Sequence, residues 1–98
     1  VPVLVDGSQT AGALETSIEA LGIDLYAFTG HKALLGPPGT GGLYVRPGLQ
    51  LETWKEGGTG TRSESLEPPP FMPERLEVGT PNSWGLAGLL AGVDWLLG

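Results

Sequence analysis

A lysine and an aspartate, each following a short apolar stretch, are the residues of this chain best suited to chemistry. Lys32 closes the run Thr29-Gly30-His31-Lys32 after the apolar residues 25–28, and Asp6 directly follows the apolar residues 3–5. A lysine amine can form a Schiff base with a carbonyl compound, and a carboxylate can keep a ring nitrogen protonated. We therefore expect Lys32 and Asp6 to hold one cofactor between the ends of two strands.

Pyridoxal phosphate is the cofactor that calls for this pair of groups, because it needs a lysine for attachment and an acidic partner for its pyridine nitrogen. The other lysine, Lys55, lies in the polar stretch 53–56, where an exposed amine is expected. Taken singly, both residues also fit simpler structural roles. An aspartate after a strand often forms a turn or a helix cap, and a lysine after a histidine is usually just exposed.

The pattern around these residues is that of a small α/β domain. Residues 2–6 and 25–28 predict two buried strands, and the apolar spacing in 14–21 predicts a short amphipathic helix that Gly22 ends. A strand, a helix and a second strand of these lengths form a βαβ unit with parallel strands. The acidic and basic groups then lie at the same edge of a sheet.

The rest of the chain adds a strand, a loop and a helix. Residues 43–45 predict a third strand that returns as in a hairpin, and residues 56–73, including the polar run 59–63, predict a long surface loop. After Pro81, Asn82 or Ser83 would cap a helix with a wide apolar stripe at positions 86, 89, 90, 93, 96 and 97.

The glycine-proline loop 36–41 begins like a Walker A phosphate loop, but the next two residues exclude that function. Gly42 and Leu43 stand where a Walker A loop needs a lysine and a serine or threonine. Nucleotide hydrolysis is therefore not expected. The glycines are better explained by positive φ angles and by close approach of the backbone to a neighbouring element.

Composition narrows the function classes further. The 98 residues are 40% hydrophobic, enough for one small domain, and the net charge of -6 is the wrong sign for nucleic acid. No apolar run approaches the roughly 20 residues that cross a bilayer, so no membrane partner is expected. The chain has no cysteine, no metal site is predicted, and the cytoplasm is the default location. Because the chain begins at Val1, at the edge of a predicted strand and without an initiator Met, we expect a fragment of a longer protein.

Four motifs, in order, resemble the cysteine desulfurase family of class V aminotransferases, which are pyridoxal-phosphate enzymes. The resemblance covers nearly the whole chain, and its motifs are Val5-Asp6-Gly7-Ser8-Gln9 (like VDGAQ), Thr29-Gly30-His31-Lys32 (like SGHK), residues 36–44, and Glu77-Val78-Gly79-Thr80-Pro81-Asn82 (like EAGTPN). It implies a three-layer α/β fragment of the mixed, mostly parallel sheet in the large domain of fold type I enzymes. Residues 1–98 would then belong to that domain, with 82–98 a helix leading toward a C-terminal small domain.

The resemblance also implies a role for each candidate residue. Lys32 would form the Schiff base, Asp6 would pair with the pyridine nitrogen, and Gln9 would donate to the ring hydroxyl oxygen. Thr29 and His31 would bind the cofactor phosphate. In this family Thr80 would reach the phosphate in the other subunit of a homodimer, with the glycines 57 and 58 in the same partner-facing region.

The implied reaction removes sulfur from L-cysteine to give alanine and an enzyme persulfide, which a sulfur-acceptor protein would then take up. Its persulfide cysteine is absent from these 98 residues, which fits a partial chain. Other class V aminotransferases and selenocysteine lyases share the same cofactor framework. A catalytically incomplete fragment, or a homologue that keeps the fold for protein interaction, is the remaining alternative.

Overall fold

The computed structural model describes residues 1–58, 64 and 67–98. The chain divides into two compact units, residues 1–49 with 82–98, and residues 50–81. The polar run 59–63 and residues 65 and 66 lie outside the described residues, so the part of the predicted surface loop that they form is left as a prediction. The two units are taken in turn.

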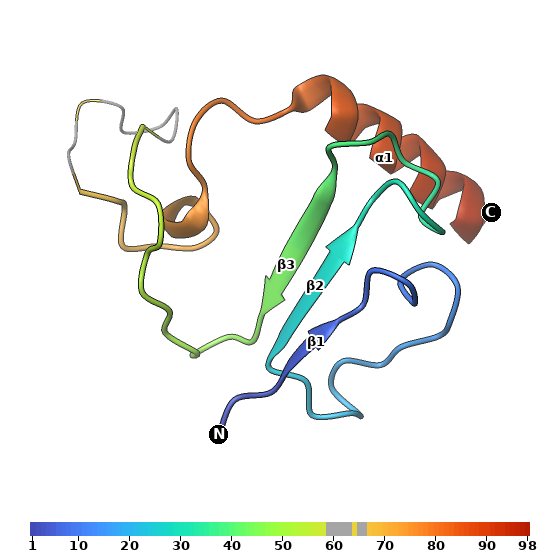
Figure 1. The fold of residues 1–98 in the computed structure, drawn as a ribbon, viewed down its shortest axis with the longest axis horizontal. Helices are drawn as coiled ribbons and strands as arrows, with labels where there is room; N and C mark the ends of the chain where they lie inside the picture. The colour runs from blue at the N-terminus through green and yellow to red at the C-terminus, as the bar shows by residue number, and fades with distance from the viewer. Residues whose placement is uncertain (59–63, 65–66) are drawn as a thin grey trace. The chain divides into compact units, whose positions relative to one another are not determined.

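A three-stranded mixed sheet forms the centre of the first unit (Figure 1). Strand β1 (Leu4–Asp6) pairs in parallel with β2 (Leu25–Thr29), and β2 pairs antiparallel with β3 (Gly41–Val45). The predicted mixed α/β sheet is confirmed, as are the parallel pair and the hairpin-type return. Strand β3 starts two positions earlier than predicted, because Gly41 and Gly42 pair with Thr29 and Phe28.

The helix predicted over 14–21 is wrong as a regular helix, since this segment makes a single turn. The turn begins at Ser17, whose Oγ accepts from the Ala20 N–H at 3.2 Å and whose carbonyl accepts from Leu21 at 3.1 Å. Gly22 ends it with φ 65°, as predicted. Short helices are marginal in water and depend on packing. Leu14 and Leu21 are both exposed here and Ile18 is only half-buried, so little apolar surface is buried to stabilise a longer helix.

Helix α1 (Ser83–Leu97) is confirmed, and Asn82 is its cap, accepting a hydrogen bond from the Gly85 N–H at 3.0 Å. The helix packs through its glycines more than through the predicted leucine stripe. Gly85 and Gly92 are buried, whereas Leu86, Leu90 and Leu97 are exposed. Glycine allows the helix backbone to approach the loop after β2 closely, because a methyl group on Gly92 would lie 2.5 Å from the Leu34 carbonyl oxygen.

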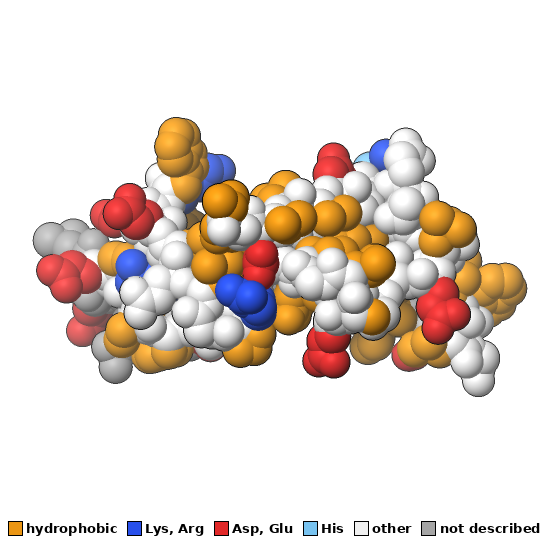
Figure 2. Space-filling model, turned by 90° about the horizontal axis from the view of Figure 1, so that it is seen from below, with side chains coloured by type: hydrophobic (Ala, Val, Ile, Leu, Met, Phe, Trp, Pro, Cys, Tyr) orange, Lys and Arg blue, Asp and Glu red, His pale blue; other side chains and the backbone are white. Residues whose placement is uncertain are grey.

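The core of the first unit is thin. Ile23 and Tyr26 are its buried apolar side chains within the described part of the chain, and the Tyr26 and Phe28 rings are 6.5 Å apart. An apolar groove of about 360 Å³ runs between the sheet and α1, and its lining includes Tyr26, Phe28, Tyr44, Leu89 and Val93. Apolar side chains also lie at the surface, drawn in orange in Figure 2.

The second unit has little regular structure in its described residues. It contains the short 3₁₀ helix η1 (Glu74–Leu76), and the Arg75 Nε–H donates to the Leu51 carbonyl at 3.5 Å. The Gly79 N–H donates to the Gly58 carbonyl at 2.7 Å. In neither unit do the described residues form a helix with the length and apolar character to span a membrane.

Candidate functional site

Asp6 is the last residue of β1 and begins a tight turn. The Gly7 N–H donates to the Ala27 carbonyl at 2.7 Å, which carries the pairing with β2 one residue beyond the strand. The Ser8 N–H donates to Asp6 Oδ1 at 3.0 Å. The aspartate therefore makes the side-chain turn that an Asp-Gly sequence favours, while its side chain stays exposed.

The pKa of the Asp6 carboxyl is lowered by neighbouring groups. The side-chain hydrogen bond from Ser8 and the Ser8 backbone N–H hold the pKa of the Asp6 carboxyl below its usual value. Desolvation opposes this shift, and the Lys32 charge adds the smallest of the effects that lower the pKa. Asp6 lies opposite Ala27 in the parallel pair, and Lys32 follows the end of β2. The parallel pairing thus places Asp6 and the segment of Lys32 at the same edge of the sheet, and their joint role toward a cofactor stays a prediction.

Thr29 and His31 form a hydrogen-bonded pair beside Lys32. The Thr29 hydroxyl and His31 Nδ1 are 2.7 Å apart, with Thr29 half-buried at the end of β2 and His31 exposed. When the hydroxyl donates to Nδ1, the ring carries its proton on Nε2 and can donate to a second acceptor. In the other tautomer Nδ1 donates and the hydroxyl is the free donor, so either arrangement offers an N–H or O–H to an anion.

The loop that carries Lys32 is anchored at both ends by backbone hydrogen bonds. The Gly30 N–H donates to the Thr40 carbonyl at 2.8 Å, and the Gly36 N–H donates to the Gly30 carbonyl at 2.7 Å. Between them the Leu35 N–H donates to the Lys32 carbonyl at 2.9 Å, with Leu35 at φ 60°. These bonds hold Lys32 in a defined turn rather than on a free loop.

The glycine-proline loop packs against this turn, and its glycines were predicted to serve positive φ angles and close backbone approach. Thr40 is buried, and its hydroxyl donates to the Pro37 carbonyl at 2.7 Å. Gly39 has φ 81°, and a methyl group on Gly36 would lie 2.8 Å from the Gly30 carbonyl oxygen. Positive φ and close backbone approach both therefore occur in this loop.

Gln9 and Thr80, the other two predicted cofactor-binding residues, lie in different units of the chain. Gln9 is exposed in the turn that follows Asp6, on the same segment as the carboxylate. Thr80 is exposed in the second unit, next to Gly79, whose N–H bonds to Gly58. That bond joins the two segments that were expected to share one region, while the role of Thr80 toward the cofactor stays a prediction.

Ser8 and Thr40 are the contributors that the sequence reasoning missed. Ser8 could have been found, because an aspartate that opens a turn commonly accepts from the N–H two residues on. Thr40 gave no such signal, because its hydroxyl bonds a carbonyl only once the loop has folded back on itself. Among the described residues, no group of three or more His, Cys, Asp and Glu side chains gathers as in a metal site.

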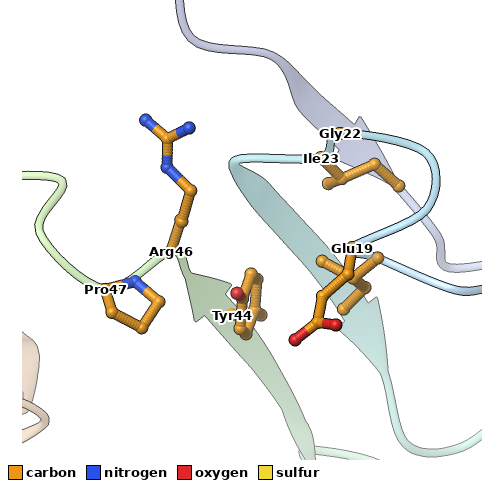
Figure 3. A pocket seen from close by; sticks show the side chains of 7 residues that line it. Glu19, Gly22, Ile23, Tyr44, Arg46 and Pro47 are labelled. Atoms are coloured by element: carbon orange, nitrogen blue, oxygen red, sulfur yellow. The ribbon is translucent and has the colours of Figure 1, made fainter.

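A second hollow, of about 330 Å³, lies where β3 ends and includes none of the predicted site residues in its lining. Tyr44 stands between Arg46 and Glu19 there (Figure 3). Arg46 forms an ion pair with Asp24 at 2.8 Å, and Asp24 Oδ2 accepts from the Val3 N–H at 2.7 Å. These two contacts satisfy the buried carboxylate of Asp24, which therefore has a structural role.

Comparison with known proteins gives a consistent result along the whole chain. A cysteine desulfurase of Yersinia pestis (strain Pestoides F) is 40% identical over an alignment of 99 positions, which covers 96% of this chain and 24% of the relative. A cysteine desulfurase of Yersinia pseudotuberculosis serotype O:1b matches equally well. The chain thus spans about a quarter of the length of the curated relatives it matches.

Solved structures agree in fold. The cysteine desulfurase CsdA of Escherichia coli superposes with a TM-score of 0.79 at 36% identity, over 98% of this chain and 25% of that one. A cystine C-S lyase, C-DES, bound to its product cysteine persulfide, reaches 0.70 at 36% identity, over 98% and 26%. The model of the aminotransferase class-V family matches residues 1–98. With the motifs in order and the lysine and aspartate at neighbouring strand ends, the chain belongs to the aminotransferase class-V family, whose enzymes depend on pyridoxal phosphate.

Proposed function

We propose that the full-length protein is a pyridoxal-phosphate enzyme that removes sulfur from L-cysteine, leaving alanine and an enzyme-bound persulfide. The relatives named cysteine desulfurase support the substrate and the reaction. The observation that carries the proposal is the parallel pairing of β1 and β2, which places Asp6 and the loop of Lys32 at the same edge of the sheet.

The exposed groups fit pyridoxal phosphate by their chemistry. An amine, a carboxylate held ionised and a hydroxyl-imidazole pair match the aldehyde, the pyridine nitrogen and the phosphate of that cofactor. When bound, the cofactor would supply a sink for the electron pair that is released at the substrate Cα. The protein then has to attach it, orient it and move protons around it.

Three residues would act on the ring. Lys32 would hold the cofactor covalently through Nζ and, once released by the substrate amine, move a proton at the substrate Cα. Asp6 would keep the ring nitrogen protonated, because its lowered pKa keeps the carboxylate negative next to that N–H. Gln9 would donate its amide N–H to the ring hydroxyl oxygen.

The phosphate would be held by neutral donors and an imidazole. Thr29 and His31 already share a hydrogen bond of 2.7 Å and would turn their remaining donors to the phosphate oxygens. Thr80 would donate its hydroxyl to the phosphate bound in the partner subunit of a homodimer. Each active site would then need two chains.

Residues 1–98 would be part of the large cofactor-binding domain, with residues 82–98 leading toward a small C-terminal domain. The protein would work in the cytoplasm and pass its persulfide sulfur to an acceptor protein. A cysteine outside these 98 residues would carry that sulfur.

A cystine C–S lyase is the second candidate, because such an enzyme matches this chain at 36% identity with its product cysteine persulfide bound. Product analysis separates the two reactions. A desulfurase given cysteine forms alanine and a persulfide on its own cysteine, whereas a lyase given cystine releases a free persulfide. Selenocysteine and simple amino-acid transamination are assayed in the same way, because other class V enzymes share the cofactor framework.

The test of the proposal is covalent trapping on the full-length protein. Borohydride reduction of the purified protein should fix pyridoxal phosphate on the peptide that contains Lys32, as measured by mass spectrometry. Lys32→Ala should abolish this label, and Lys55→Ala, which removes the chain's other lysine, should leave it unchanged. A protein that shows no cofactor absorbance and no label, or a label that survives Lys32→Ala, would refute the assignment.

A further inference from the structure

The turn that follows Asp6 and the loop that carries Lys32 meet backbone to backbone at Gly12. A methyl group placed on Gly12 would lie 2.8 Å from both the carbonyl carbon and the carbonyl oxygen of Ala33, and 3.0 Å from Leu34 Cδ2. Real side chains essentially never approach a backbone carbonyl that closely. Gly12 also has φ 83°, which side chains disfavour.

Both partners of this contact belong to segments that are otherwise held firmly. The turn before Gly12 is closed by hydrogen bonds from the Thr10 and Ala11 N–H groups to the Gly7 carbonyl, at 3.0 and 2.8 Å. The Thr10 hydroxyl also lies 3.0 Å from the hydroxyl of the buried Tyr26. Ala33 directly follows Lys32. A shift at the contact must therefore move one segment against the other.

We propose that Gly12 is a positioning residue, whose missing side chain sets the separation between the Asp6–Gln9 segment and the His31–Lys32 segment. The inference rests on the proposed function, because it matters to catalysis only if both segments hold one cofactor. Gly12 touches no reacting atom. It acts through the backbone of Ala33, so a side chain at position 12 would widen the gap that the cofactor has to bridge.

Gly48 supplies a matched control for backbone strain. It has φ 87°, close to that of Gly12, but a methyl group there would find nothing within 4 Å. Gly12→Ala and Gly48→Ala both place a side chain in the left-handed region, so both variants carry that strain. Only Gly12→Ala pushes against Ala33, so any difference between the two variants reports the contact.

The experiment compares these two variants of the full-length protein in three measurements. The first is the dissociation constant of pyridoxal phosphate, and the second is the pH dependence of the bound cofactor's absorbance, which depends on the groups around it. The third is hydrogen exchange of residues 30–36 in the cofactor-free protein. This last readout needs neither cofactor nor activity.

We expect Gly12→Ala to weaken cofactor binding by about tenfold or more, since misplacing a binding group by about 1 Å can cost up to about 100-fold. Its absorbance titration should shift, and exchange in residues 30–36 should quicken by about tenfold. Gly48→Ala should match the wild type in all three. Equal behaviour of the two variants would overturn the proposal.

The experiment distinguishes failure of this proposal from failure of the proposed function. If the wild-type protein binds no cofactor, the hydrogen-exchange contrast between the two variants still tests the contact at Ala33. Should Gly12→Ala fail to fold, exchange in the wild type decides instead. Residues 8–14 and 30–36 should then open together as one unit with equal protection, and independent opening would refute the coupling.

Discussion

Asp6 shows how one side chain can serve a structural role and a chemical role together. Its Oδ1 accepts from the Ser8 N–H at 3.0 Å, as in an ordinary turn, and the same bonds lower the pKa of the carboxyl. The sequence left the turn and the cofactor partner as alternatives. In the structure they are compatible, because the turn keeps ionised the group that would face the pyridine nitrogen.

Ser8→Ala tests this link through pH. The variant loses the side-chain hydrogen bond but keeps the backbone N–H, so the pKa of Asp6 should rise part of the way toward its usual 3.8. A lowered pKa in the folded state stabilises the fold above pH 3.8, and this stabilisation is lost as the pH falls through the lowered value. The stability gap between Ser8→Ala and the wild type should therefore shrink in acid.

A ¹³C NMR titration of the Asp6 carboxyl measures the shift, and denaturant unfolding across the acid range measures the stability. Ser83→Ala, at the start of α1, removes a hydroxyl elsewhere in the same unit and should change neither quantity. An Asp6 titration that is identical in Ser8→Ala and in the wild type would contradict the role given to Ser8.

Thr29→Val removes the hydroxyl that lies 2.7 Å from His31 Nδ1 while keeping the shape of the side chain. The imidazole then loses the hydrogen bond that orients it, and the proposed phosphate site loses a donor. Cofactor affinity should fall by about tenfold, which corresponds to about 1.4 kcal/mol. Equilibrium binding of pyridoxal phosphate measures it, and Thr29→Ser should restore most of the affinity. A Thr29→Ser variant as weak as Thr29→Val would assign the loss to packing.

At the scale of elements, the sequence pattern predicted those strands, caps and stops that depend on neighbouring residues in the chain. The strands predicted at 2–6 and 25–28 form at 4–6 and 25–29, although the first is exposed at Leu4 rather than buried. The Asn82 cap and the Gly22 stop also follow from short-range signals. The helix over 14–21 failed because its stability would have to come from packing that the pattern alone does not show. The early start of β3 was missed for a similar reason, since glycines are poor strand formers until Phe28 packs over Gly42.

In the candidate site, too, residues with a local sequence signal were predicted and residues that act on distant segments were not. Asp6, Thr29, His31 and Lys32 were predicted as site residues because each follows a predicted strand or stands in a motif. The supports under them, Thr40 and Gly12, were not found, because each acts on a segment distant in sequence. Residue types thus indicated the chemistry, and only the folded backbone showed how it is held in place.

Helix α1 supports the Lys32 loop through Gly92, and Gly92→Ala tests that support. Alanine favours a helix by about 1 kcal/mol over glycine. At this position its methyl group would lie 2.5 Å from the Leu34 carbonyl oxygen and 2.9 Å from the Leu35 carbonyl. Overpacking of this kind costs about 1–3 kcal/mol, so a net loss of stability is expected.

Thermal or denaturant unfolding measures that loss. Gly88→Ala is the matched variant, because its methyl group would meet the Pro37 ring at 3.1 Å rather than a backbone carbonyl. It should cost less than Gly92→Ala or even stabilise the helix. A Gly92→Ala protein more stable than the wild type would show that the loop yields freely.

At the scale of the whole molecule, the first unit leaves much apolar surface uncovered. Trp84, Trp95 and Leu97 on α1 are 92%, 75% and 81% exposed, so the helix is apolar on faces that the described residues leave open. A helix that is apolar all round is typical of a protein interior. Since the chain spans about a quarter of its relatives' length, stability and activity should be measured on the full-length protein.

If each active site needs two chains, two inactive variants can restore activity when they are mixed. If Thr80 completes the partner's site, a Lys32→Ala subunit paired with a Thr80→Ala subunit forms one site with both defects and one with neither. Random reassociation of two inactive variants into two-fold dimers should then restore about a quarter of wild-type activity at low cofactor concentration.

If Thr80 instead acts within its own chain, every site of the mixed dimer keeps one defect, and mixing restores nothing. Sulfide release from cysteine follows the recovery, and Lys32→Ala mixed with Asp6→Ala is the control. Lys32 and Asp6 lie in one unit of one chain, so that pair also leaves one defect in each site and should stay inactive. Recovery in the control would show that the chains exchange segments, whereas recovery only with Thr80→Ala would place Thr80 across the dimer interface.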